Sequence, residues 1–412
     1  MPPSPPGSKA ATLAFVIPWY GADARGGAEL QGLETARALA DRGYRIEILT
    51  TCSRSYMHQW EKNYHKPGEY QDGGITVRRF PVDDRETGLF AQANLAVLSG
   101  VRLDPEGEAH FVDHNINSRE LYRFIEERAG DYIFIFLPYL YGTTLKGAAV
   151  RSDRSLVMPC FHVEPYVYLA ASRRLMTEVR GLLFLTPEEK EAAESIVGEL
   201  APFAVVGGGI ETGRRGTKDR FRQSSGIMDP YILYVGRLEW GKNTHLLVSY
   251  YQHWKEHSGN GLKLVLVGAG DQIPLGGDPS IISLGTLDDQ QKMDACADAV
   301  ALCQPSVNES FSRVIMESWL NEVPVMVHGQ CPVTVGHCQR SGGGLYFEDY
   351  FQFAEVLGLL LGDENLRRSM GEAGRRYVLE NYSWERVIPG LVAAVEELTG
   401  SEIARPEKER PG

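Results

Sequence analysis

Short runs of apolar residues alternate with longer segments of helical periodicity along almost the whole chain. The runs in the first half are mostly continuous, which is typical of parallel strands buried on both faces. They predict strands at residues 13–18, 44–51, 75–81, 132–138, 156–161, 182–185 and 203–206. Between them, apolar residues at helical spacing predict a helix over 28–42 that stops at Gly43. A capping box formed by Thr186 and Glu189 predicts a second helix, which runs to Val197.

The second half repeats this alternation. Apolar runs predict strands at residues 231–235, 262–267, 281–284, 299–304, 324–328 and 345–347. Helical periodicity predicts helices at 243–257, 288–298, 311–321, 349–361, 364–381 and 384–398. Strands that alternate with helices in both halves predict an α/β fold made of two doubly wound, Rossmann-like domains that face a cleft. In such sheets ligands bind beyond the carboxyl ends of the strands.

The two halves are separated by residues 207–226, which are rich in glycine and charge and have little apolar periodicity. We therefore expect an N-terminal domain over 11–210, a hinge linker over 211–226 and a C-terminal domain over 227–383. The terminal helix, 384–400, is expected to cross back to the N-terminal domain. Residues 1–10 and 401–412 contain proline and polar residues and are expected to be disordered.

Composition narrows the class of protein. A length of 412 residues fits two domains, and a net charge of -12 argues against nucleic acid as a partner. The six cysteines are scattered, which is typical of buried, reduced thiols and not of a disulfide framework. Residues 1–10 lack the apolar core of a signal peptide, and no run of 18 apolar residues could span a membrane. These features predict a cytoplasmic protein.

Two glycine-containing turns stand between a predicted strand and a helix. Gly26 and Gly27 follow the first strand, where they would let a ligand approach the backbone and the first amides of the helix. A glycine pair is also common in ordinary turns of this kind. In the second turn, Arg237 and Lys242 follow the strand 231–235, and their spacing lets both cations reach one diphosphate at the strand end.

Glu309 and Glu317 follow the predicted strand 299–304. If one helix ran through both, they would point about 80° apart and lie about 12 Å apart along its axis. If Glu309 lies in the loop before the helix, both carboxylates can reach one ligand, and the amides of Ser310, Phe311 and Ser312 would face the same site. Two carboxylates that accept hydrogen bonds suit sugar and ribose hydroxyls. His162 follows another predicted strand and can contact a sugar or phosphate, although a lone histidine is more often structural.

Taken together, RGGAE at 25–29, GRLEWGK at 236–242, the spacing of the two glutamates and YSWE at 382–385 resemble glycosyltransferase family 4. This family contains retaining nucleotide-sugar transferases of the GT-B fold. The resemblance covers essentially the whole chain. The segment around His162 and the tyrosine-rich stretch 137–141 are most like members that act in bacterial surface-polysaccharide synthesis. Two departures from the family pattern are a glycine run at 207–209 and Asn243 in place of a frequent glycine.

The resemblance implies a role for each candidate residue. Gly26 and Gly27 would lie near the donor's phosphates and sugar, and His162 beside the transferred sugar. Arg237 and Lys242 would bind the diphosphate and stabilise the leaving group. Glu309 would contact the sugar's hydroxyls and Glu317 the ribose. The family usually works without a metal or other cofactor, and the phosphate that leaves is expected to take the acceptor's proton.

The partners implied are a nucleotide-diphospho-sugar donor and a glycan or lipid-linked acceptor of a lipopolysaccharide, an exopolysaccharide or another cell-surface glycan. Peripheral contact with the inner face of the membrane is a further expectation. It rests on two arginine pairs, Arg173–Arg174 and Arg214–Arg215, which otherwise form solvated surfaces.

Other functions remain open at this point. A sugar-nucleotide epimerase or hydrolase of the same fold would use the same donors, and an inactive nucleotide-sugar-binding protein would keep the same cleft. Gly268 and Gly270 invite a dinucleotide-binding interpretation, but Ile273 stands where that fingerprint requires a third glycine or alanine. In the resembled family this loop lies on the nucleotide side, which makes both glycines candidates for donor binding. The cluster His328, Cys331, His337 and Cys338 matches no common zinc spacing, so no metal site is expected.

Overall fold

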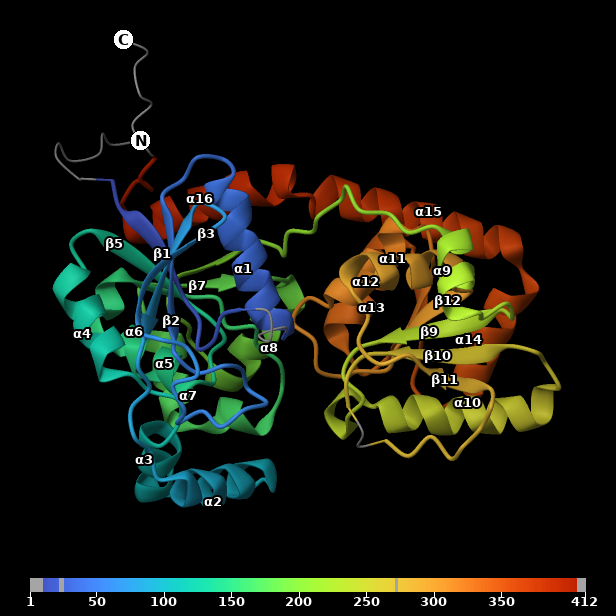
Figure 1. Cartoon of the computed structure of the whole chain (residues 1–412), viewed down its shortest axis with the longest axis horizontal. Helices are drawn as coiled ribbons and strands as arrows, with labels where there is room; N and C mark the ends of the chain where they lie inside the picture. The colour runs from blue at the N-terminus through green and yellow to red at the C-terminus, as the bar shows by residue number, and fades with distance from the viewer. Residues whose placement is uncertain (1–9, 22–25, 271–272, 406–412) are drawn as a thin grey trace, which may run out of the picture. The chain divides into compact units, whose positions relative to one another are not determined.

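The computed structural model describes residues 10–21, 26–270 and 273–405. The chain divides into two compact units: the first combines Met1–Gly209 with Val387–Gly412, and the second is Ile210–Arg386. Each unit is built on one sheet with helices on its faces (Figure 1). None of the helices in the described ranges is both long enough and apolar enough to cross a membrane.

The sheet of the first unit has the order β3-β4-β2-β1-β5-β6-β7-β8. All neighbouring strands are parallel except β3, which runs antiparallel to β4. The strands are β1 (Thr12–Val16), β2 (Ile46–Thr51), β3 (Gly68–Asp72), β4 (Ile75–Phe80), β5 (Tyr132–Phe136), β6 (Ser155–Val157), β7 (Gly181–Phe184) and β8 (Phe203–Val205). The α-helices are α1 (Gly27–Ala40), α2 (Thr87–Leu98), α3 (Pro105–Asp113), α4 (Arg119–Arg128), α5 (Gly142–Leu145), α6 (Gly147–Val150), α7 (Ala170–Glu178) and α8 (Pro187–Val197). Two 3-10 turns, η1 (Ser152–Arg154) and η2 (Pro165–Tyr168), lie on either side of β6.

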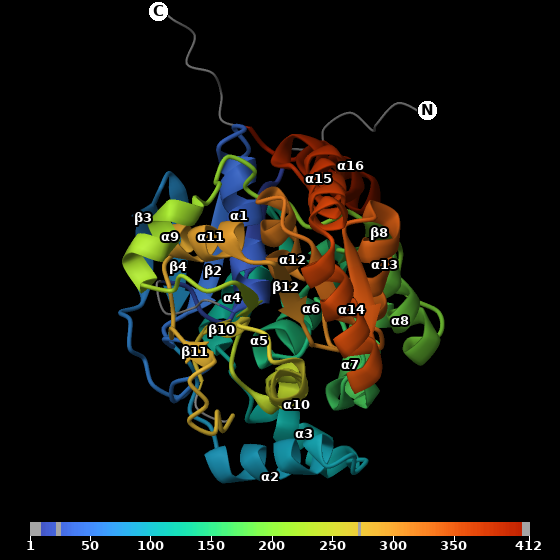
Figure 2. The same cartoon turned by 90° about the vertical axis from the view of Figure 1, so that its right-hand side faces the viewer.

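The second unit has a fully parallel sheet of order β11-β10-β9-β12-β13-β14. Its strands are β9 (Tyr231–Val235), β10 (Lys263–Val267), β11 (Ile281–Ser283), β12 (Ala301–Gln304), β13 (Val325–His328) and β14 (Gly344–Phe347). The helices are α9 (Lys218–Ser225), α10 (Thr244–Ser258), α11 (Asp289–Asp298), α12 (Arg313–Leu320), α13 (Pro332–Ser341), α14 (Tyr350–Gly362) and α15 (Glu364–Asn381), with the turn η3 (Trp240–Lys242). Figures 1 and 2 place α10 on one side of this sheet and α9 and α11 on the other.

The continuous apolar runs form the centres of both sheets, as predicted. In β1 and β5 every residue is buried, and so is every residue of β9 and β12. Helices on both faces exclude water from such strands, which is why these runs do not alternate with polar residues. The six cysteines are free and buried, as expected.

The expectation of a linker over 211–226 is wrong. The segment 211–226, expected to be a linker, contains helix α9, which buries Phe221 and pairs Arg220 and Arg222 with Asp294 and Asp298 of α11. Those ion pairs replace the apolar periodicity that usually indicates a helix. Nearly all of the stub predicted over 1–10 lies outside the described residues.

The expected disorder of 401–412 is also wrong for its first five residues, while 406–412 lie outside the described ranges. Ile403 forms a parallel bridge with Ala11, and Ile403 and Ala404 are buried. The last helix, α16 (Trp384–Thr399), leads into this segment, and its residues from Val387 onward belong to the first unit.

Candidate functional site

The strand order of the second unit identifies where a ligand would bind. Strand β9 lies between β10 and β12, so the chain leaves β9 toward one side of the sheet and returns on the other. In doubly wound sheets the crevice for a ligand opens where the order reverses, beyond the carboxyl ends of the strands. Residues 236–243, which follow β9, and residues 305–312, which follow β12, therefore form the two walls of the candidate site.

Lys242 and Glu309 come together across these two loops. The Lys242 ammonium lies 2.8 Å from Oε1 of Glu309 and 3.5 Å from the carbonyl oxygen of Asn308. Both side chains are largely buried, with exposed fractions of 25% and 11%. Oε2 of Glu309 has no hydrogen-bond partner within the described ranges. The pair therefore offers a cation and a carboxylate oxygen at the same place.

Asn243, which departs from the family's frequent glycine, adopts a backbone conformation that favours glycine. Its φ of 54° is in the left-handed region, where asparagine is tolerated better than most residues. Its side-chain amide also donates to the carbonyl of Pro305, 3.2 Å away in the other loop. The Asn243 side chain therefore links the two walls of the site.

Glu317 is held by a lysine that the sequence patterns do not single out. Helix α12 begins at Arg313, so Glu309 lies in the loop and Glu317 on the helix, as the second of the two sequence alternatives requires. The Lys292 ammonium of α11 lies 2.9 Å from Oε1 of Glu317. Burial would lower the pKa of Lys292, but the charge of Glu317 and its hydrogen bond outweigh burial and raise it. Oε2 of Glu317 has no partner in the described chain.

Arg237 contacts a different carboxylate from Lys242. Its guanidinium Nη2 lies 3.0 Å from Oε1 of Glu239, and 46% of the side chain is exposed. The two cations of the turn therefore lie in one loop but do not share a carboxylate. An exposed guanidinium can turn toward a bound anion at low cost.

The loop before α12 carries polar groups at the carboxyl end of β12. Ser312 caps the helix with φ 62° and ψ 71°, and its hydroxyl is buried without a hydrogen-bond partner in the described chain. Phe311 is buried, and its ring packs against His337 and Tyr382 at centroid distances of 5.6 and 5.1 Å. Ser310, in the same loop, is half-buried. The first amides of α12 are thereby presented at the carboxyl end of β12.

Gly268 and Gly270 let the loop after β10 pack against the loop after β9. Gly268 has a φ of 146°, and a Cβ there would lie 1.8 Å from the carbonyl oxygen of Gly236. A Cβ on Gly270 would lie 2.5 Å from the carbonyl oxygen of Leu238. Both glycines are needed for this close packing, and their part in donor binding stays a prediction.

In the first unit the order reverses at β1, which lies between β2 and β5. Gly26 precedes α1 as its N-cap and Gly27 is its first residue, while Arg25 lies outside the described residues. A Cβ on Gly26 would lie 2.0 Å from Oε2 of Glu29. The buried Glu29 carboxylate accepts a hydrogen bond from the indole of Trp19 at 2.8 Å. This carboxylate, beside the glycine turn, was not singled out by the sequence patterns, although it belongs to the RGGAE motif.

His162 lies in the loop that follows β6. Strand β6 ends at Val157, four residues earlier than predicted, and Cys160 adopts a φ of 53°. The buried Glu189 accepts the amide of Phe161 at 2.6 Å, and burial raises the pKa of this carboxyl to about 8 against the effect of its backbone hydrogen bonds. The imidazole of His162 lies 3.3 Å from Glu164, which also accepts the hydroxyl of Tyr139 at 2.7 Å.

Side chains that could share a metal ion lie elsewhere. In the described ranges, three ligating side chains within 4.8 Å of one another occur at His253, Glu256 and His257, all exposed on α10. The buried cluster around His337 is packed on aromatic rings, and burial lowers the pKa of His337 to about 3.

Comparison with known proteins identifies the second unit. The sequence profile of the family described as "Glycosyl transferases group 1" matches residues 217–377. The second unit is a group 1 glycosyltransferase domain. The matched range contains both walls of the site and all of its candidate residues from Arg237 to Glu317.

Curated relatives align with only part of this chain. An MMP α-(1→4)-mannosyltransferase from Mycolicibacterium hassiacum is 30% identical over 112 residues, which are 27% of this chain and 27% of that protein. A trehalose synthase from Rubrobacter xylanophilus is 27% identical over 177 residues, which are 39% of this chain and 41% of that protein. The aligned segments thus span less than half the length of either relative.

Solved structures match nearly the whole chain, so the likeness extends to the first unit as well as the second. Sucrose-phosphate synthase from Thermosynechococcus elongatus has a TM-score of 0.73 and 16% identity, covering 95% of this chain and 99% of that one. Anabaena HepE in complex with UDP and glucose has a TM-score of 0.68 and 13% identity, covering 94% and 99%. WaaG, a glycosyltransferase involved in lipopolysaccharide biosynthesis, has a TM-score of 0.63 and 16% identity, covering 94% and 100%. These likenesses confirm the predicted GT-B fold.

Proposed function

We propose that this protein is a retaining glycosyltransferase that moves a sugar from a nucleotide-diphospho-sugar to a glycan or lipid-linked acceptor. The acceptor would belong to a lipopolysaccharide, an exopolysaccharide or another cell-surface polysaccharide made on the cytoplasmic side of the membrane. The observation that carries the proposal is the Lys242–Glu309 pair at the point where the strand order of the group 1 domain reverses.

The chemistry of these groups suits departure of a nucleoside diphosphate. As the bond to the sugar breaks, negative charge grows on the phosphate, and nearby cations lower the energy of that transition state most. Lys242 still has donor capacity beyond its bond to Glu309, and Arg237 adds a fork of donors from an exposed position. The amides at the start of α12 supply further positive potential.

The carboxylates orient the sugar and the ribose in this proposal. Glu309 keeps one oxygen for sugar hydroxyls, and Glu317 keeps one for the ribose. His162 contacts the transferred sugar from the first unit, with its imidazole positioned by Glu164. The glycines at 26–27 approach the donor's phosphates and sugar, and Gly268 and Gly270 approach the nucleotide.

Retention and independence of metal are part of the same proposal. The leaving phosphate takes the proton of the acceptor hydroxyl, so that a bond forms from that oxygen to the sugar on the face that the phosphate leaves. The protein then acts by positioning and by neutralising charge. Product analysis by nuclear magnetic resonance tests retention of the anomeric configuration, and turnover in the presence of EDTA tests independence of metal.

The first experiment is a thermal-shift screen with UDP, GDP, ADP and dTDP, because binding to the folded state raises the melting temperature. UDP is the first to test, since the structural neighbour HepE was solved with UDP and with UDP-glucose. Product analysis with and without a glycan acceptor then separates transfer from epimerisation or hydrolysis. An inactive binding protein would bind a nucleotide but consume no donor.

Substitutions test the residues. Lys242→Ala, Arg237→Ala and Glu309→Ala should each lower turnover by about tenfold or more, because each removes one charge-assisted contact to the donor. Lys263→Ala is the matched control, since this lysine begins β10, at the opposite end of the sheet, and lies 3.8 Å from Asp229. Unchanged turnover in all three site variants would contradict the proposal.

A further inference from the structure

A large groove lies within the first unit, and one of its walls is the segment that follows β6. It has a volume of about 1380 Å³ and runs between the hairpin formed by α2 and α3 and the segment that contains η2 and α7. Figures 1 and 2 show this hairpin standing away from the sheet of that unit. Apolar side chains make up most of its walls: Val97, Val101, Leu103, Val112, Tyr168 and Leu169.

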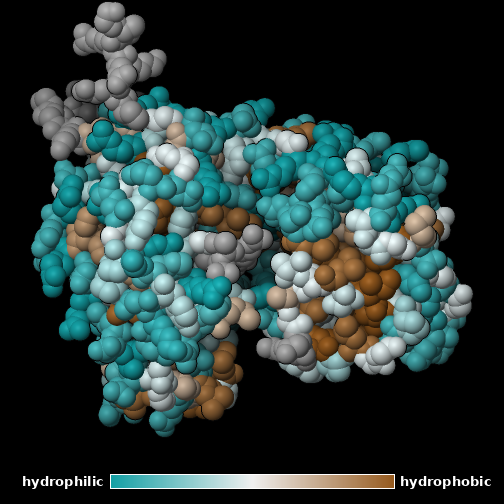
Figure 3. All heavy atoms as spheres, viewed as in Figure 1, coloured by the Kyte–Doolittle hydropathy of each residue, from teal (hydrophilic) through white to brown (hydrophobic). Residues whose placement is uncertain are grey.

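The apolar surface extends beyond the groove. Leu95, Leu98 and Val101, at the end of α2 and just after it, are 66%, 53% and 57% exposed, and Val163 and Tyr168 on the facing wall are 54% and 68% exposed. Figure 3 shows hydrophobic residues gathered over α2 at the lower edge of this unit. Exposing this much contiguous apolar surface is unfavourable unless a ligand or partner covers it.

The carboxylates of the groove are engaged in contacts within the protein, whereas some of its arginines are not. Its arginines are Arg102, Arg173 and Arg174, and its carboxylates are Asp104, Glu108, Asp113 and Glu164. Every one of these carboxylates already has a partner: Asp104 accepts the amide of Gly107, Glu108 that of Ala170, Asp113 pairs with Lys146, and Glu164 with His162.

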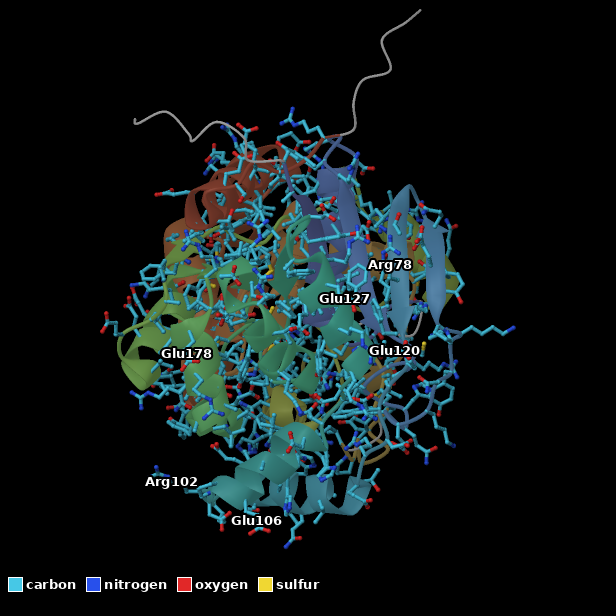
Figure 4. The ribbon with its side chains drawn as sticks, turned by 90° about the vertical axis from the view of Figure 1, so that its left-hand side faces the viewer. Arg78, Arg102, Glu106, Glu120, Glu127 and Glu178 are labelled. Atoms are coloured by element: carbon cyan, nitrogen blue, oxygen red, sulfur yellow. The ribbon has the colours of Figure 1, made fainter. Side chains whose placement is uncertain are left out.

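Two of the arginines are available to an anion. Arg173 donates to the carbonyl of Val197 at 2.6 Å, but the guanidinium groups of the exposed Arg102 and Arg174 have no hydrogen bond or ion pair to any residue that the structure describes. Figure 4 shows Arg102 pointing away from the ribbon at the end of the hairpin. The second predicted arginine pair differs, because Arg214 pairs with Asp289 and Arg215 with Glu322. Apolar walls with unpaired cations at their rim suit an amphiphile that carries a phosphate.

The groove also leads to the candidate site of the first unit. Glu164 lines the groove and holds the imidazole of His162, so one carboxylate contacts both. We propose that the groove binds the apolar chain of a lipid-linked acceptor and that Arg102 and Arg174 bind its phosphate. This inference rests on the proposed function and assigns the acceptor class. A bare glycan would meet mostly apolar walls and carboxylates that already have partners, whereas an isoprenoid or acyl chain buries apolar surface there.

The test measures binding of farnesyl phosphate to the full-length protein by calorimetry, below the concentration at which the probe forms micelles. Farnesyl phosphate is expected to bind about tenfold more tightly than farnesol or inorganic phosphate, because only it supplies both the chain and the anion. Arg102→Glu, Arg174→Glu and Val101→Asp should each weaken binding by about tenfold or more. The matched controls are Arg123→Glu, an exposed arginine on α4, and Met57→Asp, a methionine that is 68% exposed; both should retain the affinity of the wild type.

Three outcomes would overturn the inference: no binding of farnesyl phosphate, equal binding of inorganic phosphate, or groove variants that bind like the controls. Flotation with vesicles of phosphatidylcholine and phosphatidylglycerol adds a fourth. Binding to vesicles without binding of farnesyl phosphate would make this face a bilayer-docking surface instead. The nucleotide thermal-shift screen on the same preparation keeps the two proposals separate. Farnesyl phosphate binding without nucleotide binding would contradict the donor site alone, and the reverse would contradict the groove alone.

Discussion

At the scale of single residues, two lysine–glutamate pairs determine the charge of the candidate donor site. Lys242 pairs with Glu309 at 2.8 Å and Lys292 with Glu317 at 2.9 Å, and all four side chains are largely buried. Bringing such a pair out of water is costly, but removing one partner is costlier, because an unpaired buried charge remains. Each lysine therefore holds its glutamate in place, with the second carboxylate oxygen left for a ligand.

Lys292→Met tests this argument for the pair that lies farther from the proposed phosphate site. We expect the free energy of unfolding to fall by about 3 kcal/mol, because the carboxylate of Glu317 is left buried without a cation. Adding Glu317→Leu should restore at least half of that loss, since the double variant removes both charges. Urea unfolding measures all three proteins. Lys146→Met is the control: its pair with Asp113 is 40% and 56% exposed and should contribute less than about 1 kcal/mol.

Equal losses in Lys292→Met and Lys146→Met would contradict the argument, as would a double variant no more stable than the single one.

The two glutamates and Lys292 also show what the sequence can predict at the scale of single residues. Motif spacing identifies Glu309 and Glu317 and offers the loop position of Glu309 as one of two alternatives. It does not identify Lys292, because that lysine lies on another helix, 25 residues away, and belongs to no motif. Contacts of that kind depend on how helices pack across a sheet.

At the scale of helices and strands, predictability follows the apolar pattern. Strands such as β1, β5 and β9 are buried on both faces, so their composition alone identifies them. Helix α9 has only Phe221 buried, and ion pairs to α11 hold it, so no periodic stripe reveals it. Helix α2 has apolar residues on its exposed side as well as its buried side, which removes the usual amphipathic signal. The same residues supply the surface of the proposed acceptor groove.

Helix α13 determines the shape of the loop before α12 through a buried histidine. His337 packs its ring against Phe311 and bonds to the hydroxyl of Tyr377 at 2.9 Å. Burial, with a smaller effect from the charge of Arg340, lowers the pKa of His337 to about 3 from its ordinary value of 6.5. Because the folded state disfavours the protonated ring, the stability contributed by neutral His337 is complete above pH 6.5. It is lost as the pH falls toward 3.

We therefore expect His337→Gln to flatten the dependence of stability on pH. Between pH 6.5 and pH 4 the wild type should lose up to about 1.4 kcal/mol per pH unit through this group, and the variant should lack that contribution because glutamine takes up no proton. Urea unfolding at a series of pH values measures the slope. His257→Gln, at an exposed histidine of α10, serves as the control and should leave the slope unchanged. A His337→Gln slope equal to that of the wild type would show that this ring does not limit acid stability.

At the scale of the whole molecule, the sequence of the second unit is inserted between the two segments that make up the first. Residues 210–386 form the second unit, and the residues from Val387 onward belong again to the first unit. The alternation of strands and helices predicts two α/β domains, and the GT-B likeness confirms them. It does not predict that the chain stays ordered after the terminal helix, because residues 401–405 contain a single large apolar residue, Ile403, and show no strand pattern. Their order comes from hydrogen bonds to Ala11 and Arg45, the residues that directly precede β1 and β2.

Truncation after Gly400 tests whether this return stabilises the first unit. It removes backbone hydrogen bonds between Ala11 and residues 402 and 404, with N–O distances of 2.9 and 2.8 Å, and a third from Arg45 to Ala404 at 2.7 Å. It also removes the buried side chain of Ile403. At about 1 kcal/mol for each of the three hydrogen bonds and about 2 kcal/mol for the isoleucine, the free energy of unfolding should fall by about 5 kcal/mol.

Hydrogen exchange resolves this loss by unit. Amides of β1 should exchange much faster in the protein truncated after Gly400 than in one truncated after Arg405, which keeps all three bonds. Amides of β10, which pairs with β9 and β11 in the second unit, should exchange at the same rate in both proteins. If β1 and β10 respond equally, the terminal segment stabilises the chain as a whole and not the unit it joins. If neither responds, the bonds to Ala11 and Arg45 contribute no net stability, and the return of the chain is only a matter of connectivity.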